Sequence, residues 1–222
     1  MSKHLESAIK ELKKDLLALS ALVEEHLHRA VTAIHDRDES LAHTVIDTDF
    51  KIDQAEVDVE EECLKIMALH QPVAIDLRFI VAALKINNDL ERIGDLAVNL
   101  AERALFLSRI PLPEHISLDL PGMAKKAEHM LRKSMDALVN MDAELAWHVC
   151  GADDEVDDIN RKMYDQVKAA IRKHPEHIDA LIHILSASRH VERIADHATN
   201  IAEDVIYMIE GEIVRHRADE RQ

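Results

Sequence analysis

The chain has 222 residues, of which 47% are hydrophobic, 32% are charged and only 3% are aromatic. With four glycines and five prolines, residues that favour helices dominate, so the composition predicts an all-α protein and disfavours a β-sandwich. The formal net charge of −16 repels phosphate backbones and anionic lipid headgroups. We therefore expect no nucleic-acid partner and no electrostatic binding to a membrane surface.

The sequence also predicts a cytoplasmic protein. Its first 20 residues intersperse charges among apolar residues, whereas a signal peptide has a continuous apolar core. No run reaches the roughly 18 apolar residues of a membrane-spanning helix. The two cysteines, Cys63 and Cys150, are far apart and lack CxxC spacing, which indicates reduced core residues rather than a disulfide or a thiolate metal site.

Proline and glycine divide the chain into six long runs in which apolar residues recur every three or four positions, the pattern of amphipathic helices. The expected runs are residues 5–34, 36–69, 72–107, 123–140, 142–173 and 176–215. The stretch 109–122 holds three prolines and a glycine and predicts a linker. Short polar residues between Asp36 and Ser40 are expected to cap the second run.

The two halves of the chain are similar in sequence. At an offset of 104 residues, the segment 38–53 matches 142–157 without a gap. At an offset of 101, ERIGDLAVN (91–99) matches ERIADHATN (192–200). One difference in loop length explains the two offsets, so we predict two tandem, structurally similar antiparallel three-helix bundles that arose by internal duplication. The predicted units are residues 1–108 and 123–216, joined by the linker 109–122 and followed by a tail at 217–222.

Carboxylates recur at four-residue spacing in both halves. Asp49 and Asp53 are one turn apart on the second run, and Glu91 and Asp95 on the third, with Asn99 one turn further. Like charges at this spacing repel by a few tenths of a kcal/mol per pair, so the pattern needs either solvent or a bound cation. Facing stripes on neighbouring helices would give oxygen-only ligation, suited to Mg²⁺, Ca²⁺, Mn²⁺ or iron. The ten candidate metal ligands are Asp49, Asp53, Glu91, Asp95, Asn99, Asp153, Asp157, Glu192, Asp196 and Asn200.

Each of these features also has a simpler interpretation. A single acidic pair on a helix is usually a solvated surface, and the small residue Gly94 indicates either close helix packing or space beside a site. Arg92 either pairs with the neighbouring carboxylates or is an exposed surface arginine. His183, His190 and His197 share one face of the last helix but lack the ExxH pattern of a di-iron bundle. We predict that the acidic stripes face outward, at the rim of the bundles.

Two segments carry a family resemblance, NDLERIGDLAVNLAE (88–102) and RHVERIADHATNIAEDVIYMIEG (189–211). With the acidic pairs and the six-helix duplication, they make the chain similar to the PhoU family of phosphate-specific transport system accessory proteins over residues 5–215. The resemblance implies two three-helix bundles, a homodimer, and metal ions or multinuclear clusters (Fe, Mn, Mg or Zn) bound by E(D)xxxD motifs. Those motifs correspond here to Asp49, Asp53, Glu91, Asp95, Asp153, Asp157, Glu192 and Asp196.

The resemblance also implies a non-enzymatic negative regulator of the phosphate-starvation (Pho) response. Such a regulator is an adaptor between the ATPase subunit PstB of the phosphate importer and the sensor histidine kinase PhoR, and it reaches the inner face of the membrane only through these protein partners. The alternative is a carboxylate-ligated metal-binding or metal-storage helical bundle. The net charge predicts no direct phosphate binding. Because Arg189-His190 stands where the first copy has Asn88-Asp89, we expect a less acidic edge at the second site.

Overall fold

The computed structural model describes residues 3–110 and 118–211, and every regular element in these residues is helical. The prediction of an all-α protein is therefore confirmed. In the described part of the chain, each helix is too short or too polar to span a lipid bilayer. The elements are α1 (Lys3–Asp36), α2 (Glu39–Thr48), α3 (Phe50–His70), α4 (Ala74–Ser108), α5 (Leu120–Asn140), α6 (Ala143–Lys173), the 3₁₀ turn η1 (Pro175–His177) and α7 (Ile178–Glu210).

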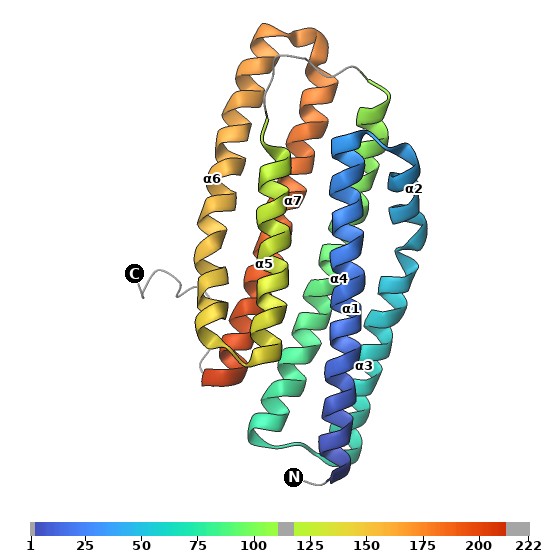
Figure 1. Cartoon of the computed structure of the whole chain (residues 1–222), viewed down its shortest axis with the longest axis vertical. Coiled ribbons are helices and arrows are strands. Elements are labelled where there is room, and N and C mark those ends of the chain that lie inside the picture. The colour runs from blue at the N-terminus through green and yellow to red at the C-terminus, as the bar shows by residue number, and fades with distance from the viewer. Residues whose placement is uncertain (1–2, 111–117, 212–222) are drawn as a thin grey trace.

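The helices form an elongated bundle of two units, which Figure 1 shows with the long axis vertical. The first unit consists of α1, the run α2–α3, and α4, and the second consists of α5, α6 and α7. Helices α4 and α7 pack extensively against each other at the centre, and α1 also contacts α5. One continuous apolar core therefore joins the two units.

The helix starts preserve the internal duplication. Asp38 caps α2 by accepting a hydrogen bond from the backbone N–H of Leu41 at 3.0 Å, and Asp142 caps α6 by accepting one from Leu145 at 3.0 Å. A cap of this kind stabilises a helix by about 1 kcal/mol. The equivalent caps are 104 residues apart, as the offset of the sequence repeat predicts.

The second run is not one continuous helix, so the prediction of an unbroken helix over 36–69 is wrong at one position. The run is interrupted at Asp49, between α2 and α3. The imidazole Nε2 of His26 lies 2.8 Å from the backbone oxygen of Val45, which is the carbonyl that the Asp49 N–H would bond in a regular helix. A side chain inserted into the ladder of helical hydrogen bonds is a known cause of such breaks.

The linker is shorter than expected, and the last helix ends earlier. Helix α5 begins at Leu120, not at 123, because Asp119 accepts a hydrogen bond from the Gly122 N–H at 3.1 Å and Pro121 lies in the first turn, where its missing N–H costs nothing. Helix α7 ends at Glu210, not at 215, because Gly211 adopts a left-handed conformation with φ +78°. Residues 111–117 of the linker and the predicted tail 217–222 lie outside the described residues.

Close packing explains the small residue at position 94. A Cβ added to Gly94 would lie 3.2 Å from two side-chain carbons of Ile52 and 3.8 Å from Oδ1 of Asp49. The second unit has Ala195 and Val156 at the equivalent positions, both fully buried. The first unit therefore packs glycine against isoleucine, and the second packs alanine against valine. The smaller residue on one helix is matched by the larger residue on the other.

This exchange predicts a coupling between positions 94 and 52. Gly94→Ala alone should change the stability little, because a gain of up to ~1 kcal/mol in helix propensity is offset by the contact with Ile52. In an Ile52→Val background the same substitution should be more favourable by about 0.5–1 kcal/mol. Urea unfolding of the two single variants and the double variant measures this term. Strict additivity of the two substitutions would contradict the packing explanation.

Candidate functional site

The first acidic cluster lies where α4 passes the junction of α2 and α3. Asp49 occupies the junction, Asp53 lies in the first turn of α3, and Glu91 and Asp95 lie one turn apart on α4. Burial, reinforced by the charges of Asp53 and Asp95, raises the pKa of Asp49 from 3.8 to about 6. Burial and the charge of Asp95 also raise the pKa of Glu91. The two predicted stripes therefore face each other.

The second acidic cluster repeats this arrangement between α6 and α7. Burial raises the pKa of Asp153 to about 6, with further contributions from the charges of Asp196 and Asp157. Burial and the same two aspartates also raise the pKa of Glu192. None of the eight carboxylates in the two clusters is fully buried, so the prediction that they lie at the rim of the bundles is confirmed.

The two asparagines do not lie with the carboxylates in the same way. The side-chain amide of Asn99 donates to the backbone oxygen of Asp95 at 2.8 Å, one turn back on its own helix. The amide of Asn200 instead donates to Asp89 Oδ1 on α4 of the first unit, at 3.3 Å. Asn200 thus connects the two units, a role that its spacing from Asp196 did not indicate.

Each cluster has an arginine that pairs with at least one of its carboxylates. Arg92 lies 3.3 Å from Glu91 and 3.2 Å from Asp95, so the ion-pair interpretation of this arginine is correct, although its side chain is also exposed. In the second unit Arg161 lies 3.5 Å from Asp157. The spacing of four residues between Asp157 and Arg161 on α6 was the available signal for this pair.

The clusters supply the right atoms for a hard cation, but the side chains do not converge on one point. Carboxylate oxygens are the ligands that Mg²⁺, Mn²⁺ and iron accept, and the buried Oδ1 of Asp49 has no hydrogen-bond partner among the described residues. Within those residues, however, no three His, Cys, Asp or Glu side chains are arranged so that they could hold a metal ion. Arg92 already offsets part of the charge of Glu91 and Asp95, which weakens the attraction for a cation there.

Three histidines of α7, spaced by seven residues, lie on the side of this helix that faces α4, where the two units meet. The ring of His183 stacks on Phe106 with 3.6 Å between ring centroids, and His197 Nδ1 lies 2.8 Å from Asp89 Oδ1. Asp89 is buried here. The sequence difference between Asp89 in the first copy and His190 in the second therefore reflects the contact between the units, in which Asp89 takes part. It does not reflect a difference in acidity between the two clusters. The spacing of seven was the available signal, since it marks a helix–helix seam.

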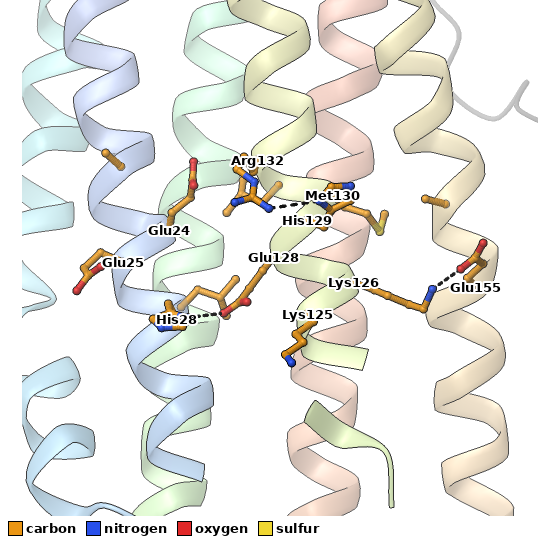
Figure 2. A pocket seen from close by; sticks show the side chains of 14 residues that line it. Glu24, Glu25, His28, Lys125, Lys126, Glu128, His129, Met130, Arg132 and Glu155 are labelled. Carbon is orange, nitrogen blue, oxygen red and sulfur yellow. Dashed lines mark hydrogen bonds and ion pairs between the residues drawn. The ribbon is translucent and has the colours of Figure 1, made fainter. Parts of the chain in front are cut away.

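A groove of about 890 Å³ lies between α1, α5 and α6, and its lining includes no carboxylate of the two acidic clusters. Figure 2 shows its charged side chains, some of which approach one another in pairs. His28 lies 3.4 Å from Glu128, and Lys126 pairs with Glu155. Four glutamates among the lining residues balance the two lysines and the arginine. The groove therefore has no excess positive charge with which to bind a phosphate ion.

The fold and its two clusters define a helical-bundle protein built by duplication, with a pair of rim-facing carboxylate sites. The chain belongs to the PhoU family, since the sequence model of the PhoU domain matches it twice, at residues 16–104 and 120–205. These matches correspond to the two units of the fold.

The free, buried Cys63 and Cys150, whose pKa values burial raises to about 12, are core residues, as expected.

Relatives cover almost the whole chain. The phosphate-specific transport system accessory protein PhoU homolog of Pseudomonas putida is 35% identical over 216 residues, 97% of this chain and 84% of its own length. The homolog of Aquifex aeolicus is 38% identical over 210 residues, 94% of each chain. These names describe an accessory protein of a phosphate transport system.

Solved structures have the same fold. PhoU from Pseudomonas aeruginosa superposes with a TM-score of 0.90 at 35% identity, covering 93% of this chain and 99% of that one. The phosphate transport system regulatory protein PhoU from Streptococcus pneumoniae gives a TM-score of 0.85 at 29% identity, covering 95% and 99%. Both comparisons include the two units together, so the pairing of the units is shared as well as the fold of each.

Proposed function

We propose that this protein represses the phosphate-starvation response when phosphate is plentiful. It does so as a non-enzymatic adaptor between the phosphate importer, through the ATPase subunit PstB, and the sensor histidine kinase PhoR. The observation that carries the proposal is the full-length similarity, over both units, to proteins named as accessory and regulatory components of phosphate transport. The protein acts in the cytoplasm as a homodimer and reaches the membrane through these partners.

The surface of the molecule fits such a role. A net charge of −16 keeps the chain away from nucleic acid and anionic lipid, so specific protein contacts decide where it binds. The acidic clusters lie at the rim, where a partner can reach Asp53 and Asp196, the most exposed of their carboxylates. Exposed charges of one sign steer a partner of the opposite charge and select against a wrong one.

The test is the output of a phosphate-starvation promoter in phosphate-rich medium. We expect high output in cells that lack the gene and low output when the wild-type gene is restored. Alanine at Asp49, Asp53, Glu91 and Asp95 tests the first cluster, and its control is alanine at four exposed carboxylates elsewhere, Asp136, Glu144, Asp165 and Asp179. The two variants change the net charge equally. Low output after deletion would overturn the proposal.

The second candidate function is metal binding by the two clusters, for shape, docking or storage. It is favoured by Oδ1 of Asp49, which lacks a hydrogen bond and has His26 Nε2 at 3.9 Å, and by the raised pKa values of Asp49 and Asp153. A nearby cation would relieve the repulsion that contributes to both pKa values. Calorimetry with Mn²⁺ should then detect two classes of site, and alanine at the four carboxylates of one cluster should abolish one class. Unchanged binding after both sets of substitutions would reject these ligands.

A further inference from the structure

Helix α3 carries an apolar seam on its solvent-facing side. Phe50, Val57 and Leu64 are spaced by seven residues, and they are 63%, 43% and 51% exposed. Seven residues are close to two helical turns, so the three side chains share one face. The seam extends over about 21 Å, at 1.5 Å per residue.

The seam is not part of the core of the unit. The buried residues of α3 lie on the opposite side of the helix and are Ile52, Val59, Cys63 and Ile66. In Figure 1, α3 lies at the edge of the bundle, with α1 and α4 on its inner side. Folding of the described chain therefore leaves this apolar surface in water.

The internal duplication supplies a comparison for this surface. At the offset of 104, the buried residues of α3 correspond to Val156, Met163, Val167 and Ala170, which are buried in α6. The three seam residues correspond to Asp154, Arg161 and Lys168, which are all exposed. The core register is thus the same in both units, and the solvent-facing side is charged in one and apolar in the other. Packing of the unit itself does not need an apolar residue at these positions.

Carboxylates flank the seam on both sides. Asp53 and Glu60 lie on one side of the seam around the helix axis, and Asp58 and Glu61 lie on the other. All four are exposed. Of the two lysines on this helix, Lys65 is already paired with Glu62 at 2.7 Å. The seam is therefore an apolar strip within a negative surface, and complementary charge requires a positive partner.

We infer that the α3 seam binds an amphipathic helix of a partner protein, in which apolar residues recur every three or four positions and lysine or arginine flanks them. The heptad spacing fits a helix lying along α3, because helices pack side by side when apolar residues recur at this period. The inference rests on the proposed function, in that the partner belongs to the phosphate-sensing machinery. It adds a docking surface beside the first acidic cluster, with which it shares only Asp53.

Two synthetic peptides test the inference. Both are lactam-bridged helices with leucine every three or four residues, and lysine flanks the leucines in one whereas glutamate flanks them in the other. Measured by fluorescence anisotropy, the lysine peptide should bind at least about tenfold more tightly than the glutamate peptide. Salt should weaken its binding. Serine at the seam residues should weaken binding about tenfold or more, and serine at Asp154, Arg161 and Lys168 should not. Equal binding of the two peptides, or no effect of the seam substitutions, would overturn the inference.

Charge reversal and sedimentation complete the test. Glu60→Lys combined with Glu61→Lys should favour the glutamate peptide, because the flanking charge then has the opposite sign. Circular dichroism must show unchanged helicity in each variant. If serine at the seam converts a dimer to a monomer in sedimentation, a second copy covers the seam, and the inference of a basic partner helix is overturned.

The promoter assay separates this inference from the proposed function. A folded seam variant that fails to repress the promoter in phosphate-rich medium supports a docking role. If the variant represses like the wild type, the seam is not the docking surface, while the comparison of deletion with wild type still decides whether the protein is a repressor. If deletion has no effect, the proposed function fails, and the peptide titration still decides what the seam binds.

Discussion

Replacing Lys85 with methionine is expected to lower the free energy of unfolding by about 3 kcal/mol. Lys85 Nζ lies 2.9 Å from Oδ1 of Asp204, whose side chain is only 2% exposed, and this ion pair joins α4 of one unit to α7 of the other. Lys85 also lies over the ring of Tyr207, 5.1 Å from its centroid. Methionine keeps most of the apolar stem but removes the charge, so the buried carboxylate loses its ion pair with Lys85.

Urea unfolding measures this loss as a shift of the midpoint with unchanged slope. Lys14→Met is the control, because Lys14 also lies 2.9 Å from a carboxylate, that of Glu11, but this pair is largely exposed. An exposed pair contributes up to about 1 kcal/mol, so the control should change the stability much less. Replacing Asp204 with leucine in the Lys85→Met variant should recover part of the loss, since an apolar pair needs no counter-charge. Equal effects of the two methionine substitutions would contradict the assigned role of this pair.

Features that repeat within the chain could be predicted from the sequence. The cap between Asp36 and Ser40 was predicted from its short polar residues. The facing stripes were visible because they occur twice at a constant offset, and two copies reduce the chance that a pattern is accidental. The outward orientation also followed from chemistry, since four carboxylates in the middle of an apolar bundle would be too costly to desolvate. These signals are local or repetitive, so they need no knowledge of tertiary contacts.

Features that depend on contacts between distant segments could not be predicted. The break at Asp49 depends on His26, a residue of another helix, and the pairing of the two units depends on Asp89 and His197, which are 108 residues apart. The histidine repeat gave a partial signal, but nothing in the spacing indicates which helix it contacts. The exposed apolar positions of α3 were hidden for a related reason, because burial within the bundle and exposure at a docking surface produce the same apolar residues in a sequence.

Asp49→Asn is expected to stabilise the protein by about 1–2 kcal/mol at pH 7.5, in the presence of a chelator. Burial and the charges of Asp53 and Asp95 raise the pKa of Asp49 to about 6, compared with 3.8 for an ordinary aspartate. Ionisation of Asp49 therefore costs more free energy in the folded than in the unfolded protein. The two pKa values correspond to at most about 3 kcal/mol, and solvent screening at the rim reduces this figure. Asparagine has a similar shape and no charge to desolvate.

The same linkage fixes the pH dependence. Above pH 6 Asp49 is ionised in both states, so its full penalty is present; between about pH 6 and 4 only the folded state binds the proton, and the penalty disappears. The contribution of Asp49 to the stability should therefore rise on acidification from pH 7.5 to 5, while His26, His183 and His190, whose pKa values burial lowers, contribute in the opposite direction. Asp49→Asn should lack the share that Asp49 contributes. Asp153→Asn should behave alike, because the pKa of Asp153 is also about 6. As a control, Asp136→Asn, at an exposed position of α5, should leave the pH profile unchanged. A stabilisation by Asp49→Asn that is the same at pH 5 as at pH 7.5 would show that helix propensity, and not the repulsion within the cluster, is its cause.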